Sequence, residues 1–112
     1  GKAVDLGALL VGVYEDGKLR YAGKVGAGFN DAIRAELVAA LTRLASDEQP
    51  FAEPPPRPVA RNALWLRPEL VIRAEFAGWT GDGLVRQAAY KGLDLGKDPR
   101  KVRREVARAR SG

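Results

Sequence analysis

Residues 19–25 alternate between apolar and polar side chains directly after the turn signal Glu15-Asp16-Gly17-Lys18. Period-two alternation after a glycine-containing turn is typical of a β-hairpin with one face in water. The apolar run at residues 9–14 supplies the first strand of this hairpin. Arg20 and Lys24 occupy polar positions of the second strand, so we expect both on one exposed strand face. This pattern favours an antiparallel β fold.

A single helix is expected after the hairpin. Asn30 can cap a helix over residues 31–46. Within that range the apolar residues fall at spacings of three and four and form one stripe: Ile33, Leu37, Leu41 and Leu44. We therefore expect this stripe to pack on the core.

Turn signals divide the rest of the chain into short strands. Residues 47–59 hold five of the seven prolines and are expected to form a loop. Asp98-Pro99 resembles a cap with a first-turn proline, opening a short basic helix at residues 98–110. Further strands are expected at residues 63–66, 70–79 and 84–90. The sequence predicts a mainly β fold in one domain, residues 1–112: a five-stranded antiparallel barrel with one packed helix.

Composition excludes several classes of site. The 112 residues contain no Cys and no His, which excludes disulfides, thiolate zinc sites and the commonest general base. No apolar run reaches the length of roughly 18 residues that suggests a membrane span, and no signal peptide is recognisable. We expect a cytoplasmic protein that carries no metal site of its own.

The net charge of +5 is concentrated near one end of the sequence. Residues 1–90 carry 11 basic and 11 acidic residues, whereas residues 91–112 carry 8 basic and 3 acidic ones. A basic segment suits an anionic partner, and it equally suits a solvated chain end. Charge alone leaves these two interpretations open.

Three motifs invite functional interpretations that the spacing weakens. The glycines at residues 23–28 lack the spacing of a dinucleotide or Walker loop and suit a corner between a strand and a helix. Glu15 and Asp16 resemble a hairpin turn more than an acid–base pair. Four aromatic residues could stack on bases, although packing is the commoner role of such residues in a small barrel: Tyr21, Trp65, Trp79 and Tyr90.

Basic side chains that we expect on strand faces are the remaining candidates for function. Such groups suit phosphate contacts, which position a protein on a duplex without reading its sequence. A solvated barrel exterior is the competing explanation. The candidates are Arg20, Lys24, Arg61, Arg67, Arg73 and Arg86.

Several segments, in order over about residues 6–99, resemble the C-terminal domain of bacterial end-joining ATP-dependent DNA ligases (the ligase D type). Residues 9–12, 21–26 and 28–29 resemble the opening of that domain, and residues 50–52 its proline-phenylalanine. Trp65-Leu66-Arg67-Pro68-Glu69-Leu70-Val71 and Glu75-Phe76-Ala77-Gly78-Trp79-Thr80 are similar to its most distinctive segments. Tyr90-Lys91-Gly92-Leu93 and Lys97-Asp98-Pro99 match its closing motif in part.

This resemblance implies an OB-fold barrel that acts as the mobile lid of a nucleotidyltransferase and grips nicked DNA during strand sealing in repair. The parent would use ATP and Mg²⁺, bind broken or nicked duplex DNA, and pair this barrel with its own adenylation domain. An end-binding repair protein is a further candidate partner, and a nucleoid-associated monomer is expected. The Lys-x-Asp-Gly nucleophile motif is absent from residues 1–112, so this domain alone should be inactive. We expect an excised domain or the C-terminal part of a larger polypeptide.

The resemblance also assigns candidate site residues. In the family the closing motif runs Gly-Leu-Arg-x-Asp-Lys, and its arginine and lysine engage the triphosphate. Only Lys97 matches that role, because Asp94 replaces the arginine and Gly96 the aspartate. The candidates for DNA contact are Arg20, Lys24, Arg67, Arg73, Arg86 and Lys91.

Two other functions stay open at this point. A stand-alone single-strand binder would use stacked aromatic residues. A protein-interaction barrel would touch no nucleic acid. Preference for nicked duplex over single-stranded DNA would support the ligase domain, and the reverse preference would support the single-strand binder. The absence of salt-dependent binding to any nucleic acid would leave the protein-interaction barrel.

Overall fold

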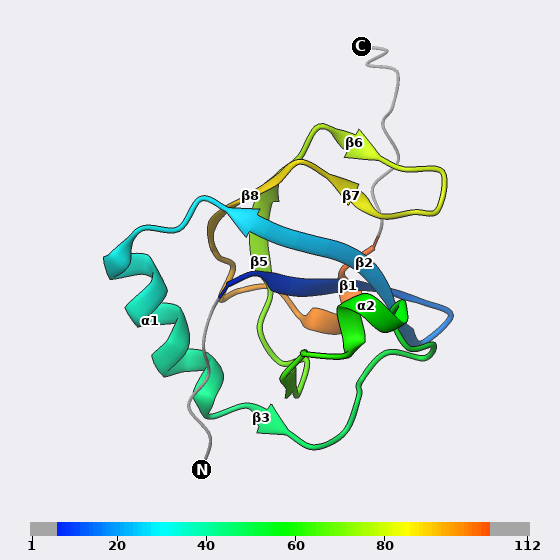
Figure 1. Ribbon diagram of the computed structural model, residues 1–112, viewed down its shortest axis with the longest axis horizontal. Coiled ribbons are helices and arrows are strands. Elements are labelled where there is room, and N and C mark those ends of the chain that lie inside the picture. Colours follow the sequence, from blue (N-terminus) through cyan, green and yellow to red (C-terminus); the bar gives the residue numbers. More distant parts are fainter. Residues whose placement is uncertain (1–6, 104–112) are drawn as a thin grey trace.

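The computed structural model describes residues 7–103, and its first element is the expected hairpin (Figure 1). Strands β1 (Leu9–Glu15) and β2 (Lys18–Ala27) pair antiparallel through a two-residue turn. Asp16 and Gly17 have φ of +53° and +76°, a left-handed turn that Gly adopts freely and Asp tolerates. The two carboxylates at residues 15 and 16 therefore belong to a turn, as the sequence indicated.

A β-bulge at Ala22 changes which face each basic residue of β2 occupies. The pairing shifts by one residue there, so that Arg20 lies opposite Val13 and Lys24 lies opposite Leu10. Val13 and Leu10 are three residues apart on β1 and point to opposite faces of the sheet. The expectation that Arg20 and Lys24 share a face is therefore wrong, because the extra residue reverses the alternation between them.

The main sheet has the strand order β1-β2-β8-β5, with β5 at Ile72–Glu75 and β8 at Ala88–Leu93. β8 pairs antiparallel with β5 and parallel with β2, so the sheet is not wholly antiparallel as expected. β2 and β8 are joined by the long connection that parallel strands require, which begins with helix α1 (Asp31–Thr42). Gly28 makes this possible: a Cβ there would lie 2.5 Å from the carbonyl oxygen of Tyr90.

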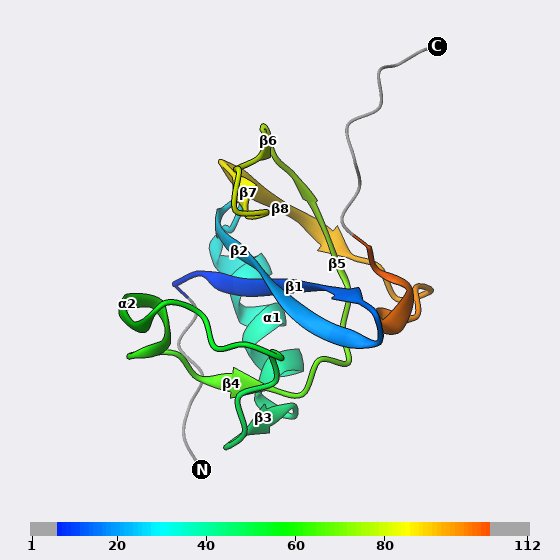
Figure 2. The same cartoon turned by 90° about the vertical axis from the view of Figure 1, so that its right-hand side faces the viewer.

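Two of the expected strands are each broken into two. The range 70–79 becomes β5 and β6 (Gly78–Trp79), and the range 84–90 becomes β7 (Val85–Arg86) and β8. The first break spans residues 76–77, directly before Gly78 with φ of +155°, and the second lies at Gln87 with φ of +53°. β6 and β7 form a separate hairpin, which lies at the opposite end of the molecule from β3 (Ala45–Ser46) and β4 (Trp65–Leu66) (Figures 1 and 2).

Helix α1 (Asp31–Thr42) is shorter than the predicted helix at residues 31–46. Asn30 caps it by accepting a hydrogen bond from the backbone N–H of Ile33 at 2.8 Å. Residues Ala45–Ser46 instead form β3, which pairs antiparallel with β4 (Trp65–Leu66). The backbone groups of these two residues pair with β4, so they do not continue the helix. The predicted apolar stripe does pack inward, with Leu37 only 1% exposed.

The proline-rich segment is more ordered than the loop expected at residues 47–59. It contains a one-turn helix, α2 (Arg57–Ala60), with proline in its first turn. Phe51 is buried, and Gln49 holds its backbone at both polar groups: the Gln49 amide donates to the Phe51 carbonyl, and the Phe51 N–H donates to Gln49 Oε1. Gly12 of β1 leaves room for the Phe51 ring, since a Cβ there would lie 2.8 Å from it.

The predicted basic helix at residues 98–110 is only one 3-10 turn, η1 (Pro99–Lys101), within the described residues. Asp98 caps it as expected, accepting from the N–H of Arg100 at 3.0 Å. Val102 is extended, and its carbonyl accepts a hydrogen bond from the N–H of Tyr14 at 2.8 Å. Attachment to β1 therefore replaces the continuation of the helix. Residues 104–110 of the predicted helix lie outside the described residues.

The main core lies between α1 and the central strands. Its buried members are Leu9, Val25, Leu37, Leu41, Ala88 and Tyr90. The architecture is mainly β and consistent with the expected OB-fold. Within residues 7–103 the strands do not close into a barrel, because β1 and β5 are unpaired edges of the main sheet.

Candidate nucleic-acid and nucleotide interface

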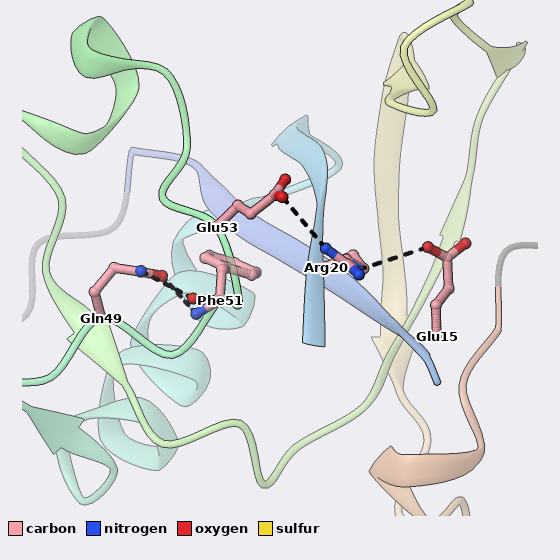
Figure 3. A network of polar contacts seen from close by, with 5 residues as sticks. All are labelled: Glu15, Arg20, Gln49, Phe51 and Glu53. Atoms are coloured by element: carbon pink, nitrogen blue, oxygen red, sulfur yellow. Dashed lines mark hydrogen bonds and ion pairs between the residues drawn. The ribbon is translucent and has the colours of Figure 1, made fainter. Parts of the chain in front are cut away.

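Arg20 is neutralised by two carboxylates. Figure 3 shows its guanidinium between the carboxylates of Glu15 and Glu53. The nitrogen–oxygen distances are 4.0 Å to Glu15 and 3.6 Å to Glu53, and the Arg20 side chain is 31% exposed. The network joins the β1–β2 hairpin to the proline-rich segment that also carries Gln49 and Phe51. A cation between two carboxylates is a poor phosphate ligand, because binding an anion there would require an existing ion pair to break.

Arg67 also has internal partners. Its Nε lies 2.9 Å from Glu69 Oε2, and its Nη2 donates to the backbone carbonyl of Arg43 at 3.1 Å. Its own N–H donates to the carbonyl of Leu44 at 2.8 Å. These contacts attach the segment after β4 to the C-terminal end of α1, so the structure gives Arg67 a packing role.

The outer face of β5 and β8 brings together two of the predicted DNA contacts. Arg73 and Glu75 are exposed and alternate with the inward-facing Ala74. Lys91 is the extra residue of a bulge on β8, and its Nζ lies 3.4 Å from Glu75 Oε1. Arg73 has no ion pair among residues 7–103, so the pair of strands presents a net positive face.

An open depression of about 570 Å³ lies between the end of β5 and the start of β8, next to the β6–β7 hairpin. Its lining residues are Ala74, Glu75, Phe76, Gln87 and Ala89. Arg86 is exposed immediately before Gln87, whose left-handed backbone is uncommon for a residue other than glycine. Sequence reasoning missed Gln87, because its signal is a strand break that no residue pattern predicts.

Lys97 lies in a segment attached to the sheet at both ends. The N–H of Asp94 donates to the Val71 carbonyl at 2.8 Å, and the Val102 carbonyl accepts from β1. Between these points Lys97, Arg100 and Lys101 are exposed, and none has an ion pair within the described part of the chain. The carboxylate of Asp98 is occupied by its cap. We call residues 94–103 the basic strap.

The other predicted residues are dispersed. Lys24 is exposed on β2, and Arg61 is exposed directly after α2. Neither has an ion pair among residues 7–103. The structure therefore separates the basic candidates into the β5–β8 face, the basic strap and isolated positions.

The aromatic residues pack on one another, which is the role that the sequence analysis favoured for them. Tyr21 contacts Phe51 edge-on with ring centres 5.5 Å apart, and Phe51 contacts Trp65 in the same way at 6.4 Å. At the other end of the molecule Phe76 and Trp79 pack edge-on at 5.0 Å.

Tyr90, the fourth of these aromatic residues, stacks on Phe29 with ring centres 5.5 Å apart. Burial raises the pKa of Tyr21, and burial followed by the charge of Glu36 raises the pKa of Tyr90. These shifts follow from packing and mark no acid–base site.

Residues 7–103 contain no group of three or more His, Cys, Asp or Glu that could hold a metal ion. No helix in the same range is long and apolar enough to cross a membrane.

Comparison with known proteins identifies the family. The family described as "ATP dependent DNA ligase C terminal region" matches residues 2–95. The multifunctional non-homologous end joining DNA repair protein LigD of Mycobacterium tuberculosis H37Rv is 36% identical over 105 residues, which cover 94% of this chain and 14% of that protein. The LigD protein of Pseudomonas aeruginosa is 38% identical, over 91% of this chain and 12% of that protein.

Solved structures give the same result. The crystal structure of the ligase domain from M. tuberculosis LigD superposes with a TM-score of 0.84 at 37% identity, covering 88% of this chain and 32% of that chain. A mycobacterial DNA ligase D complexed with ATP and MES gives a TM-score of 0.81 at 37% identity, covering 33% of its chain. This chain spans a minor part of each relative. It belongs to the ATP-dependent DNA ligase family, as the C-terminal domain of a ligase of the end-joining LigD type.

Proposed function

We propose that this chain is the lid and DNA-clamping domain of its parent ligase, assisting lysine adenylation and then gripping nicked duplex DNA in repair. The observation that carries the proposal is the separation of basic side chains into two exposed surfaces on a ligase C-terminal domain. The basic strap and the β5–β8 face lie on different elements. Two separate cationic surfaces suit a domain that meets two anionic partners in turn.

The basic strap suits the nucleotide. Lys97, Arg100 and Lys101 are exposed and uncompensated within residues 7–103, so they can offset negative charge on phosphates without losing an internal partner. A cation that approaches the departing pyrophosphate stabilises the charge that develops there. The ATP and Mg²⁺ of the parent would be bound mainly by its adenylation domain, because no metal-ligand cluster occurs in residues 7–103.

The β5–β8 face suits DNA. Arg73 and Lys91 lie on β5 and β8, and Arg86 directly precedes Gln87, one of the residues that line an open depression rather than an enclosed pocket. Contacts of this kind hold a phosphate backbone without reading bases, as a ligase that seals any sequence requires. Lys24 is a further candidate on an adjacent strand, whereas Arg20 and Arg67 are better explained by their internal contacts.

The test uses the full-length parent ligase, a cytoplasmic repair enzyme by this proposal, and separates its steps. Lys97→Ala should slow transfer of AMP from labelled ATP to the enzyme by at least about tenfold, the usual scale for losing one well-placed charged contact. It should leave sealing of a pre-adenylated nick unchanged. Arg57→Ala removes an exposed arginine on α2, away from both surfaces, and is the matched control. Equal effects of both variants on self-adenylation would refute the lid role of the strap.

A further inference from the structure

Gln87 has a left-handed backbone that no turn requires. Its φ of +53° lies in a region where residues other than glycine are uncommon, with Asn and Asp as the usual exceptions. Among residues 7–103 one other non-glycine residue, Asp16, has a positive φ, and it belongs to the two-residue turn between β1 and β2. Gln87 instead joins two strands directly, after Arg86 of β7 and before Ala88 of β8 (Figure 1). A strained residue outside a turn indicates a constraint other than chain reversal.

The chain on both sides of Gln87 is fixed by hydrogen bonds and packing. Before it, the carbonyl of Arg86 accepts a hydrogen bond from the N–H of Ala77 at 2.8 Å, next to the β6–β7 hairpin. After it, Ala88 is 6% exposed and pairs with Val25 of β2. Backbone strain persists only where the surrounding structure imposes it, and it clusters at sites that bind ligands. The direction in which the Gln87 side chain leaves the backbone is therefore fixed.

The side-chain amide of Gln87 has no internal partner. Gln87 is exposed, and its amide forms no hydrogen bond within residues 7–103. The other glutamine of the chain, Gln49, uses both of its polar groups, because its amide nitrogen donates to the Phe51 carbonyl and its Oε1 accepts from the Phe51 N–H. Gln49 therefore has a structural role, whereas Gln87 offers two N–H donors and one acceptor oxygen to a partner outside the described chain.

Gln87 lines the open depression between the end of β5 and the start of β8. Two of the other lining residues, Ala74 and Ala89, have short side chains that leave room for a small group. Glu75 also lines the depression, but its carboxylate lies 3.4 Å from the Lys91 ammonium, which offsets the negative charge. An open depression with a free amide suits one unit of a polymer that passes over the surface.

We infer that this depression is an uncharged subsite for one sugar–phosphate unit of DNA, and that the Gln87 amide donates a hydrogen bond to a phosphate oxygen there. The inference rests on the proposed DNA-clamping role of the β5–β8 face. Glutamine side chains are among the groups that contact phosphates and sugars without reading bases. Arg86, exposed directly before Gln87 and without an ion pair in residues 7–103, supplies a cation for a neighbouring phosphate. The cations supply the long-range attraction, and the amide fixes the position of the strand.

Gln87→Gly in the full-length ligase tests this inference with three measurements. The variant lacks the amide, so its affinity for nicked duplex in fluorescence anisotropy should fall about tenfold, the scale of one hydrogen bond to a charged group. A neutral amide releases no counterion, so the slope of log K against log salt should stay within about 0.3 of the wild-type slope. Glycine adopts the left-handed backbone without strain, so the midpoint of thermal unfolding should be unchanged or higher.

Two further variants separate DNA contact from a structural role. Gln87→Ala also removes the amide but keeps a Cβ, so it should lose as much affinity as Gln87→Gly and unfold at a lower temperature than that variant. Gln49→Ala removes the structural glutamine and should show the reverse pattern, a lower midpoint with wild-type affinity. Wild-type affinity of Gln87→Gly would overturn the inference. A loss of affinity that comes with a lower midpoint or a changed slope would also overturn it, because the variant would then have disturbed the fold or the cations.

Methylphosphonate substitution along the nicked duplex locates the contact. At the phosphate that Gln87 contacts, this uncharged group should weaken wild-type binding, and Gln87→Gly should reduce that penalty about threefold or more, as expected for two groups in direct contact. Absence of such coupling at every backbone position would overturn the subsite. The clamp role fails separately. An unchanged salt slope after replacing Arg73 and Arg86 would refute the DNA face itself, whereas a changed slope in that variant with wild-type affinity in Gln87→Gly would refute only the subsite.

Discussion

Phosphate contact by the β5–β8 face predicts a specific change in the salt dependence of DNA binding. Each phosphate neutralised by a cation contributes a slope of about −0.9 to log K against log salt on duplex DNA. Arg73 and Arg86 have no ion pair within residues 7–103, so their full charge is available. Arg73→Ala with Arg86→Ala should therefore reduce the slope by about 1.8. A fourfold rise in salt should then weaken binding about twelvefold less than in the wild type.

Arg20→Ala is the informative comparison, because Arg20 is also an arginine on the main sheet but lies between Glu15 and Glu53. Its removal should leave the slope unchanged to within about 0.3, since no counterion is released at a charge that is already paired. Glu75→Gln should act in the opposite direction, because it frees Lys91 from an ion pair of 3.4 Å. The expected gain is one further contact at most.

The assay is fluorescence anisotropy of the full-length ligase on nicked duplex, from about 50 to 200 mM salt, a range over which phosphate contacts dominate. Several unrelated DNA sequences should give the same loss, as expected for backbone contacts. An unchanged slope in the double variant, or an equal change in Arg20→Ala, would refute the assignment of this face. Loss of the slope on removing Arg100 and Lys101 would instead assign DNA binding to the basic strap.

Three further predictions follow from burial, charge and titration. Leu37→Ala should lower the free energy of unfolding, measured in urea, by about 3–5 kcal/mol because the Leu37 side chain is only 1% exposed. The control Leu95→Ala, at a residue that is 80% exposed, should lower it by less than about 0.5 kcal/mol. Equal losses in the two variants would contradict the placement of Leu37 in the core. Asp94→Arg in the parent ligase should speed self-adenylation, because an arginine offers a phosphate a planar fork of hydrogen-bond donors. It should leave the sealing of a pre-adenylated nick unchanged. An unaltered rate of self-adenylation would place Asp94 away from the triphosphate. Burial raises the folded-state pKa of Tyr21 and Tyr90. The contribution of these two residues to the free energy of unfolding should therefore be constant below about pH 10 and be lost as pH rises through the raised values. Replacing both residues with Phe should remove that loss in thermal unfolding, and its persistence would exclude these two groups as the cause.

Local patterns predicted the elements whose cause is local. The hairpin turn at residues 15–18 requires left-handed backbone that Asp and Gly supply, and the Asn30 cap bonds to the N–H three residues later. The turn and the start of α1 were therefore predictable. The end of α1 was not, because residues 45–46 pair with β4, a strand that is distant in sequence. Helix propensity is a property of the local sequence, and it does not include pairing with a distant strand such as β4.

Site residues show the same division. The sequence identified Arg20, Arg67 and Arg73 as equivalent exposed cations on strands or turns. Tertiary contacts distinguished them. Arg20 forms an ion pair with Glu53, and Arg67 donates a hydrogen bond to the Arg43 carbonyl, both from other parts of the chain. The bulge at Ala22, which separates Arg20 from Lys24, also has no residue signature.

The sequence by itself determined the family, the mainly β class and the absence of any thiolate or imidazole chemistry, since each depends on which residues are present and in what order. Only the tertiary structure decided which cations have no ion pair, and which strand edges have no partner strand, within residues 7–103. An ion pair such as Arg20–Glu53, or an open edge such as that of β5, depends on segments that meet only after the chain folds. Ion pairs and backbone hydrogen bonds form only between groups that lie close together, and packing decides which remote residues do so.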